Sequence, residues 1–102
     1  MQQDPIVYVV DDDEAIRSAL RLLMKSADLR VVTCASAEEF LKAHKPELPG
    51  CLVLDIRMPG MNGLELQRLL NDRHIRVPVV IMSGHGDVSM AVQAMKDGAV
   101  DF

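Results

Sequence analysis

The amino-acid sequence predicts an α/β domain in which helices cover both faces of a parallel β-sheet. Short apolar runs typical of strands alternate along the chain with segments whose apolar residues recur at helical spacing. The strand segments are also continuously apolar, as strands are when both faces of a sheet are buried. With 102 residues, the chain is long enough for one such domain and too short for two.

The chain opens with a predicted strand followed by an amphipathic helix. A β-branched and aromatic run, Ile6–Val10, predicts the first strand, and the acidic residues Asp11, Asp12 and Asp13 stop it. The apolar residues that then recur at helical spacing are Ile16, Ala19, Leu20, Leu23 and Met24. Asp13 stands where this helix begins, and we expect it to act as the N-cap.

A second strand and helix are predicted directly afterwards. The short run Arg30–Cys34 has the composition of a strand. Ser36 and Glu39 have the spacing of a capping box, and the apolar Phe40 follows them. The pattern up to this point is therefore strand, helix, strand, helix.

The third strand ends on a lone carboxylate. Cys51 to Leu54 is an apolar run, and Asp55 follows it at the point where the strand must stop. The residues that prevent its simple continuation are Pro59, Gly60 and Gly63. Asn62, with Glu65 three residues later, predicts the start of the third helix.

The fourth strand ends on a small polar residue. Val79 to Met82 is apolar, and Ser83 follows it. Asp87 is expected to cap a fourth helix, which Gly98 should end. Ala99 to Phe102 resembles the opening of a fifth strand, so this strand is expected to be incomplete and no fifth helix follows.

Composition and charge exclude several classes of protein. The net charge is −4 and the basic residues are scattered, so we expect no nucleic-acid binding by this chain. No apolar run approaches the roughly 20 residues that span a bilayer, and the first residues lack the pattern of a signal peptide, which predicts a cytoplasmic protein. Cys34 and Cys51 have the spacing of neither a metal site nor a redox motif, and we expect free thiols.

Acidic and hydroxyl side chains follow three of the predicted strands. Because right-handed crossovers place the carboxyl ends of parallel strands at one edge of the sheet, Asp11 to Asp13, Asp55 and Ser83 should converge there. Carboxylates brought together repel one another unless a cation is present, and oxygen ligands with an adjacent phosphate favour Mg²⁺. Asp55 is then the candidate nucleophile for a phosphoryl group.

Four motifs in this order resemble those of a known family. They are VDDD at residues 10–13, LDIRMPGMNG at 54–63, SGHGD at 83–87 and MKDGAVDF at 95–102. Over essentially the whole chain, the sequence resembles a CheY-like receiver domain of a two-component response regulator, most closely of the FixJ type. The resemblance implies a doubly wound, flavodoxin-like sheet with strand order 2-1-3-4-5, and one receiver domain over residues 1–102.

The resemblance also assigns roles to individual residues of the acidic site. Asp55 would be the phosphoacceptor. Asp12 would bind Mg²⁺ directly, and Asp11 would bind it through a water molecule. Arg57 would contribute its backbone carbonyl to the metal, so its side chain would not be needed for ligation.

Further roles concern the switch and the output. Ser83 would be the switch hydroxyl and Phe102 the switch aromatic, and His85 lies at a position that influences phosphoryl lifetime in the family. The family implies a sensor histidine kinase as partner, dimerisation through the last helices and strand, and a helix-turn-helix effector domain that this chain lacks. A conserved family lysine expected three residues after Phe102 is also absent, which predicts impaired switching and a C-terminally truncated domain.

Two alternatives belong to other classes. Asp11 and Asp13 formally satisfy the D-x-D pattern of a haloacid-dehalogenase phosphatase, but Ala15 occupies a position where that family normally has Thr or Val. A non-phosphorylated pseudo-receiver would act only as a binding module, and it would typically have lost Asp55 or the acidic pair. We therefore expect a phosphoacceptor signalling domain and not an enzyme.

The incomplete fifth strand carries an expectation about association. If the polypeptide stops at Phe102, an apolar face and the edge of the fourth strand are both exposed. Burial of apolar surface is worth roughly 25 cal/mol per Å², so uncovering a few hundred Å² removes several kcal/mol. We expect either that the polypeptide continues or that two chains associate through this region.

Overall fold

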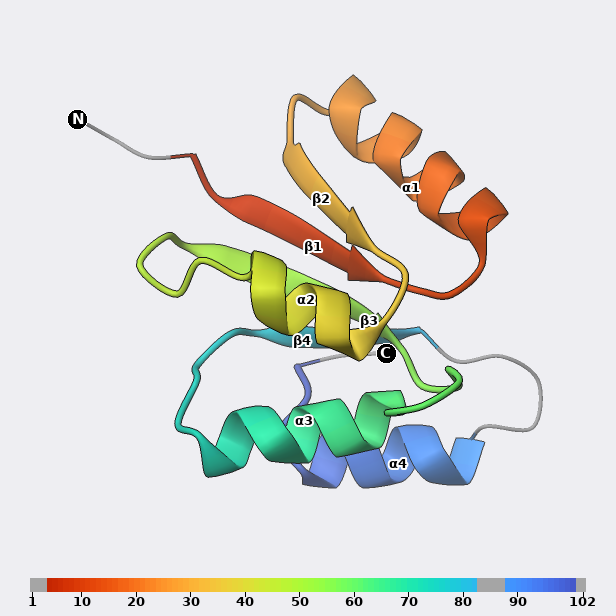
Figure 1. The fold of residues 1–102 in the computed structure, drawn as a ribbon, viewed down its shortest axis with the longest axis vertical. Helices are drawn as coiled ribbons and strands as arrows, with labels where there is room; N and C mark the ends of the chain where they lie inside the picture. The colour runs from red at the N-terminus through yellow and green to blue at the C-terminus, as the bar shows by residue number, and fades with distance from the viewer. Residues whose placement is uncertain (1–3, 83–87, 101–102) are drawn as a thin grey trace.

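The computed structural model describes residues 4–82 and 88–100 and contains eight elements in strict alternation (Figure 1). In chain order they are β1 (Ile6–Val10), α1 (Glu14–Ser26), β2 (Arg30–Cys34), α2 (Ala37–Ala43), β3 (Gly50–Asp55), α3 (Gly63–Asp72), β4 (Val79–Met82) and α4 (Val88–Lys96). The four strands and four helices that the sequence predicts up to Lys96 are confirmed within this part of the chain. The opening of a fifth strand, expected over Ala99 to Phe102, is not formed at Ala99 and Val100, and residues 101–102 lie outside the described part. None of the helices described is long and apolar enough to cross a membrane.

The strands form one parallel sheet in the order β2-β1-β3-β4. The predicted flavodoxin-like order is thereby confirmed for these four strands. After α4 the chain returns to the sheet, where the Val100 amide donates a hydrogen bond of 2.7 Å to the carbonyl of Val79. The preceding carbonyl, that of Pro78, accepts instead from Leu52 of β3, so Val100 lies on the opposite edge of β4.

The main core lies between the sheet and three of the helices. Figure 1 shows α1 on one side of the sheet and α2, α3 and α4 on the other. Alternate residues of β1 point to this second side, and the Tyr8 ring packs edge to face against Phe40 of α2, with 5.2 Å between ring centroids. The largest fully buried side chains are Tyr8, Phe40, Ile6, Leu52, Leu54, Ile56, Leu66, Leu70, Ile81, Val9 and Val10.

Capping side chains fix where the first three helices begin. Asp13 accepts a hydrogen bond from the Ala15 amide, which confirms it as the N-cap of α1. Asn62 and Glu65 form the complete reciprocal capping box expected at α3. The box expected at α2 is only half formed: Ser36 caps the Glu39 amide, but the carboxylate of Glu39 accepts from the amide of Ala35.

The C-terminal ends of α1, α3 and α4 share one hydrogen-bonding pattern. In each, the amide of the residue three positions beyond the helix donates to the carbonyl of the third-last helical residue, and the residue just before that donor has a positive φ. The turn residues are Asp28 (φ 59°), His74 (φ 56°) and Gly98 (φ 109°). The predicted end at Gly98 is thus confirmed.

Polar contacts fasten α4 to α3. The buried Gln67 side chain donates a hydrogen bond of 2.9 Å to the carbonyl of Ala94. One turn further along, the side-chain amide nitrogen of Asn71 donates to the backbone carbonyl of Asp97, and Nε of Arg68 lies 3.4 Å from the Asp97 carboxylate. The C-terminal half of α4 is therefore held against the helix that follows β3.

Candidate metal centre

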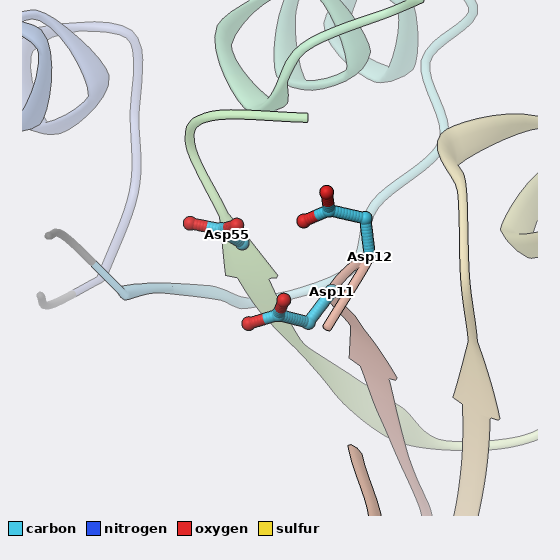
Figure 2. Close-up of side chains that lie close together, drawn as sticks. All are labelled: Asp11, Asp12 and Asp55. Carbon is cyan, nitrogen blue, oxygen red and sulfur yellow. The ribbon is translucent and has the colours of Figure 1, made fainter. Parts of the chain in front are cut away.

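Three carboxylates meet at the carboxyl edge of the sheet. Asp11 and Asp12 directly follow β1, and Asp55 is the last residue of the neighbouring strand β3. One carboxylate oxygen from each residue lies within 4.8 Å of the other two, and Figure 2 shows the three side chains grouped around one space. The convergence predicted from the parallel topology is therefore present, although 44 positions separate Asp11 from Asp55.

The sheet register places Asp55 beside the end of β1. Val10, the last residue of β1, pairs with Leu54, so Asp55 and Asp11 are the next residues on the two strands. On the other side, Asp55 pairs with Met82 of β4. The loop that follows is tied back by a hydrogen bond of 2.8 Å from the Gly63 amide to the Ile56 carbonyl.

Asp11 is the buried member of the cluster, only 3% exposed. Its Oδ1 accepts a hydrogen bond of 2.9 Å from the Asp13 amide, and its backbone amide donates to the carbonyl of Cys34. Burial raises the pKa of the Asp11 carboxyl, the bond from Asp13 opposes that rise, and the charges of Asp12 and Asp13 add to it. Arg17 donates to the Asp11 carbonyl at 2.9 Å, and its positive charge lowers this pKa.

The donor set fits a hard divalent cation. All three side chains offer oxygen, and two of them are wholly or partly buried. Asp12 is exposed, which leaves room for the water ligands that Mg²⁺ retains. Burial is the main cause of the raised pKa of Asp11, and a cation here would offset both the burial of its charge and the repulsion from Asp12 and Asp13.

Arg57 is the second residue of the loop between β3 and α3. It is exposed, and it lines a surface pocket of about 370 Å³ together with Ile56, Met58, Pro59, Asn62 and Met90. Of these residues, Met90 belongs to α4. Ser83, His85 and Phe102, to which the sequence assigned further roles, lie outside the described residues, as does the expected cap Asp87.

Both cysteines are free thiols, as the sequence predicts. Burial raises the pKa of Cys34 to about 11, and burial also raises the pKa of Cys51. Neither thiol is therefore appreciably ionised at neutral pH.

Two neighbours of the cluster were missed by the sequence analysis. Nothing in the sequence predicts the hydrogen bond from Arg17 to the Asp11 carbonyl except the presence of a basic residue in the second turn of the first helix. Gly63 was noted only as a residue that interrupts a strand, yet it lies directly against the backbone of Asp55. Its position at the start of a helix could have indicated a close contact there, since alanine is normally the more favourable residue in a helix.

An open parallel sheet in the order 2-1-3-4, with three carboxylates beyond its carboxyl ends, defines a flavodoxin-like α/β domain with an acidic site. Residues 7–102 match the response regulator receiver domain family. The chain belongs to this family, whose members receive their signals from sensor histidine kinases and bind Mg²⁺ at an acidic pocket.

Curated relatives are similar over nearly all of the chain. The transcriptional regulatory protein FixJ of Azorhizobium caulinodans is 51% identical over 96 residues, which are 94% of this chain and 46% of that protein. The C4-dicarboxylate transport transcriptional regulatory protein DctD of Pseudomonas aeruginosa is 46% identical over 94% of this chain and 21% of its own length. The chain thus spans less than half of these relatives.

Solved structures agree with the fold. The response regulator StyR superposes with a TM-score of 0.91 at 49% identity, covering 98% of this chain and 50% of that one. The crystal structure of FixJ-N gives a TM-score of 0.88 at 48% identity, covering 99% and 81% respectively. These similarities and the family match leave no basis for the haloacid-dehalogenase alternative.

Proposed function

We propose that this receiver domain accepts a phosphoryl group on the carboxylate of Asp55 from a sensor histidine kinase. The observation that carries the proposal is the meeting of Asp11, Asp12 and Asp55 at one edge of the sheet. The pseudo-receiver alternative is less favoured, because all three carboxylates are retained and converge. The domain would act as a phosphoacceptor and not as an enzyme with turnover.

Each residue of the cluster has a distinct part in the proposal. Asp12 would hold Mg²⁺ directly, Asp11 through water, and Asp55 and the Arg57 carbonyl would complete the protein ligands. When bound, the cation neutralises negative charge on the carboxylates and on the incoming phosphoryl oxygens. Because Asp13 is committed to capping α1, it is not expected to contribute.

The transfer itself is a displacement at phosphorus. An oxygen of the Asp55 carboxylate forms a bond to phosphorus, and the bond from phosphorus to the imidazole nitrogen of the donor phosphohistidine breaks. The electron pair of that bond leaves with the imidazole, which becomes neutral or takes up a proton from water. The product is an aspartyl phosphate on this chain.

The output is proposed from the relatives. Ser83 and Phe102 would respond to the phosphoryl group, and the response would reach transcription through a DNA-binding domain outside this sequence. Dimerisation through the face of α4 and the segment after it is supported by exposed apolar side chains there. Val92 is 44% exposed, Met95 36% and Val100 62%.

Intact-mass spectrometry tests the phosphoacceptor. With acetyl phosphate and Mg²⁺, the wild-type chain should gain the mass of one phosphoryl group, and Asp55→Asn should gain none. Asp13→Asn is the matched control, since asparagine keeps the cap and the site should still be labelled. Labelling of Asp55→Asn would overturn the assignment, and an unlabelled wild type that still binds Mg²⁺ would identify a pseudo-receiver.

A further inference from the structure

Gly63 lies closer to the backbone of Asp55 than any side chain would allow. It is the first residue of α3, and it is buried. A Cβ atom at Gly63 would lie 2.5 Å from the carbonyl oxygen of Asp55 and 2.9 Å from the Cα of Ile56. Contacts this short with backbone atoms do not occur in folded proteins. The absence of a side chain therefore lets α3 start directly against the residue that carries the carboxylate.

The backbone conformation of Gly63 does not require glycine. Among the described residues, the glycines with a positive φ are Gly60 and Gly98, and Gly63 is not one of them. At a helix position with an ordinary φ, alanine is normally preferred because glycine loses more conformational entropy on folding. The close approach to Asp55 and Ile56 is thus the remaining reason for glycine here.

A hydrogen bond joins the start of α3 to Ile56, the residue that follows Asp55. The Gly63 amide donates to the carbonyl of Ile56 at 2.8 Å. The position of the helix start is fixed in turn by the capping box, in which Asn62 accepts from the Glu65 amide at 2.9 Å and Glu65 accepts from the Asn62 amide at 3.0 Å. A displacement of the first turn of α3 would therefore move the backbone that carries Asp55.

We propose that Gly63 is a positioning residue for the phosphoacceptor, because its missing side chain sets where the Asp55 carboxylate stands relative to Asp11 and Asp12. The proposal rests on the proposed function for its consequence in phosphoryl transfer. A side chain at position 63 pushes the Asp55–Ile56 peptide away from α3. The carboxylate oxygens, which now lie within 4.8 Å of one another, then lose the arrangement needed to share one cation.

The same strand provides a matched control. A Cβ atom at Gly50, the first residue of β3, would lie 2.4 Å from the carbonyl oxygen of Ile6. Gly50→Ala therefore introduces an equally severe backbone clash on β3, but at the end of the strand remote from Asp55. A general loss of stability should affect both variants, whereas loss of positioning should affect only Gly63→Ala.

The test compares Gly63→Ala and Gly50→Ala at a temperature where circular dichroism shows both to be folded. Mg²⁺ alone is titrated, with the amide shifts of Asp12 and Asp55 followed by NMR, and the initial rate of labelling by acetyl phosphate is measured by intact mass. Gly63→Ala should lose about tenfold or more in both Mg²⁺ affinity and labelling rate, and Gly50→Ala should stay within about twofold of wild type. A folded Gly63→Ala with wild-type values would overturn the proposal.

A second pair of variants covers the case in which Gly63→Ala does not fold. Asn62→Ala removes the cap that fixes the start of α3 and adds no atoms, and Ser36→Ala removes the equivalent cap of α2. Asn62→Ala should weaken Mg²⁺ binding about threefold or more, whereas Ser36→Ala should not change it. Equal Mg²⁺ affinity in these two variants, with Gly63→Ala unfolded, would also overturn the proposal.

The readouts separate this proposal from the proposed function. If the wild-type chain binds Mg²⁺ but is never labelled, phosphoryl transfer fails as the function, and the Mg²⁺ titrations of Gly63→Ala and Gly50→Ala still decide the positioning role. If the wild type is labelled and Gly63→Ala behaves like it, only the positioning role is overturned.

Discussion

At the scale of single residues, Asp11 is the carboxylate whose negative charge is unfavourable in the folded state. It is the most buried of the three carboxylates. Its acidic neighbours are Asp12, the next residue in the chain, and Asp55 on the adjacent strand β3. Because its pKa is raised above the ordinary value of 3.8, the folded state prefers the protonated form. The free energy of unfolding of the metal-free protein should therefore fall as the pH rises through 3.8 toward the raised pKa.

This sign gives a prediction for Asp11→Asn. Without Mg²⁺ at pH 7, the variant should melt at a higher temperature than wild type, since it removes a buried charge and keeps an oxygen that can accept from the Asp13 amide. At a pH below 3.8 the difference should shrink. Thermal melts followed by circular dichroism measure both effects.

Mg²⁺ should shift the balance of stability toward the wild type. At about ten times the dissociation constant, a ligand that binds only the folded state stabilises it by about 1.4 kcal/mol, so wild type should gain in melting temperature and Asp11→Asn should gain less. An Asp11→Asn protein that is less stable than wild type without metal, or that responds equally to Mg²⁺, would contradict this account of Asp11.

Asp12 and Asp13 are adjacent in sequence, but we expect their substitutions to fail in different ways. Asp12→Ala should abolish Mg²⁺ binding with little effect on metal-free stability, because Asp12 is exposed. Asp13→Ala should cost about 1 kcal/mol of stability through loss of the α1 cap and keep the metal affinity. Calorimetric Mg²⁺ titration and urea unfolding separate the two, and equal loss of affinity in both would show that the ligands are assigned one residue out of place.

At the scale of elements, the sequence predicted where helices begin better than where they end. Asn62 with Glu65 and Asp13 are short-range signals that operate within one turn, and both were confirmed. The positive φ values of Asp28 and His74 at two of these ends were not predicted, because residues other than glycine at positive φ leave little trace in a single sequence. Glu39 was assigned to the right helix, but it bonds to Ala35, since two neighbouring amides compete for one carboxylate.

These two helix ends predict stabilising substitutions. Asp28→Gly and His74→Gly remove the strain of a positive φ in the folded state, but glycine also raises the conformational entropy of the unfolded chain. The first effect is the larger, so each substitution should raise the free energy of unfolding by roughly 0.5 to 1 kcal/mol. Gly98→Ala is the control of opposite sign, since φ is 109° there and the substitution should destabilise α4. Urea unfolding of the three variants measures the effects, and a loss of stability in both glycine variants would refute the argument.

At the scale of the whole molecule, topology assembles the site. Alternating strands and helices with continuously apolar strands were sufficient to predict a parallel sheet, and a parallel sheet places Asp11, Asp12 and Asp55 at one edge. The strand order came from the resemblance to receiver domains, because periodicity alone does not distinguish the possible orders. The approach of Gly63 to Asp55 depends on how α3 packs at the end of β3, and no local pattern encodes that distance.

The two faces of the sheet also differ in a way that the sequence could only partly predict. Three helices cover one face, whereas α1 alone lies over the other among the described residues (Figure 1). Apolar residues on α1 remain exposed, with Leu22 at 73% and Leu23 at 59%. Self-association of the chain stays a prediction that size-exclusion chromatography with light scattering can test.

The central claim is that the fold brings three carboxylates together so that Asp55 takes the phosphoryl group. The most direct measurement is to label the chain with acetyl phosphate and Mg²⁺, reduce it with borohydride, and sequence the peptides by mass spectrometry. Reduction converts an aspartyl phosphate to homoserine, which marks the labelled position permanently. We predict homoserine at position 55 and only when Mg²⁺ is present. Homoserine at position 11, 12 or 13, or equal conversion without Mg²⁺, would contradict the account.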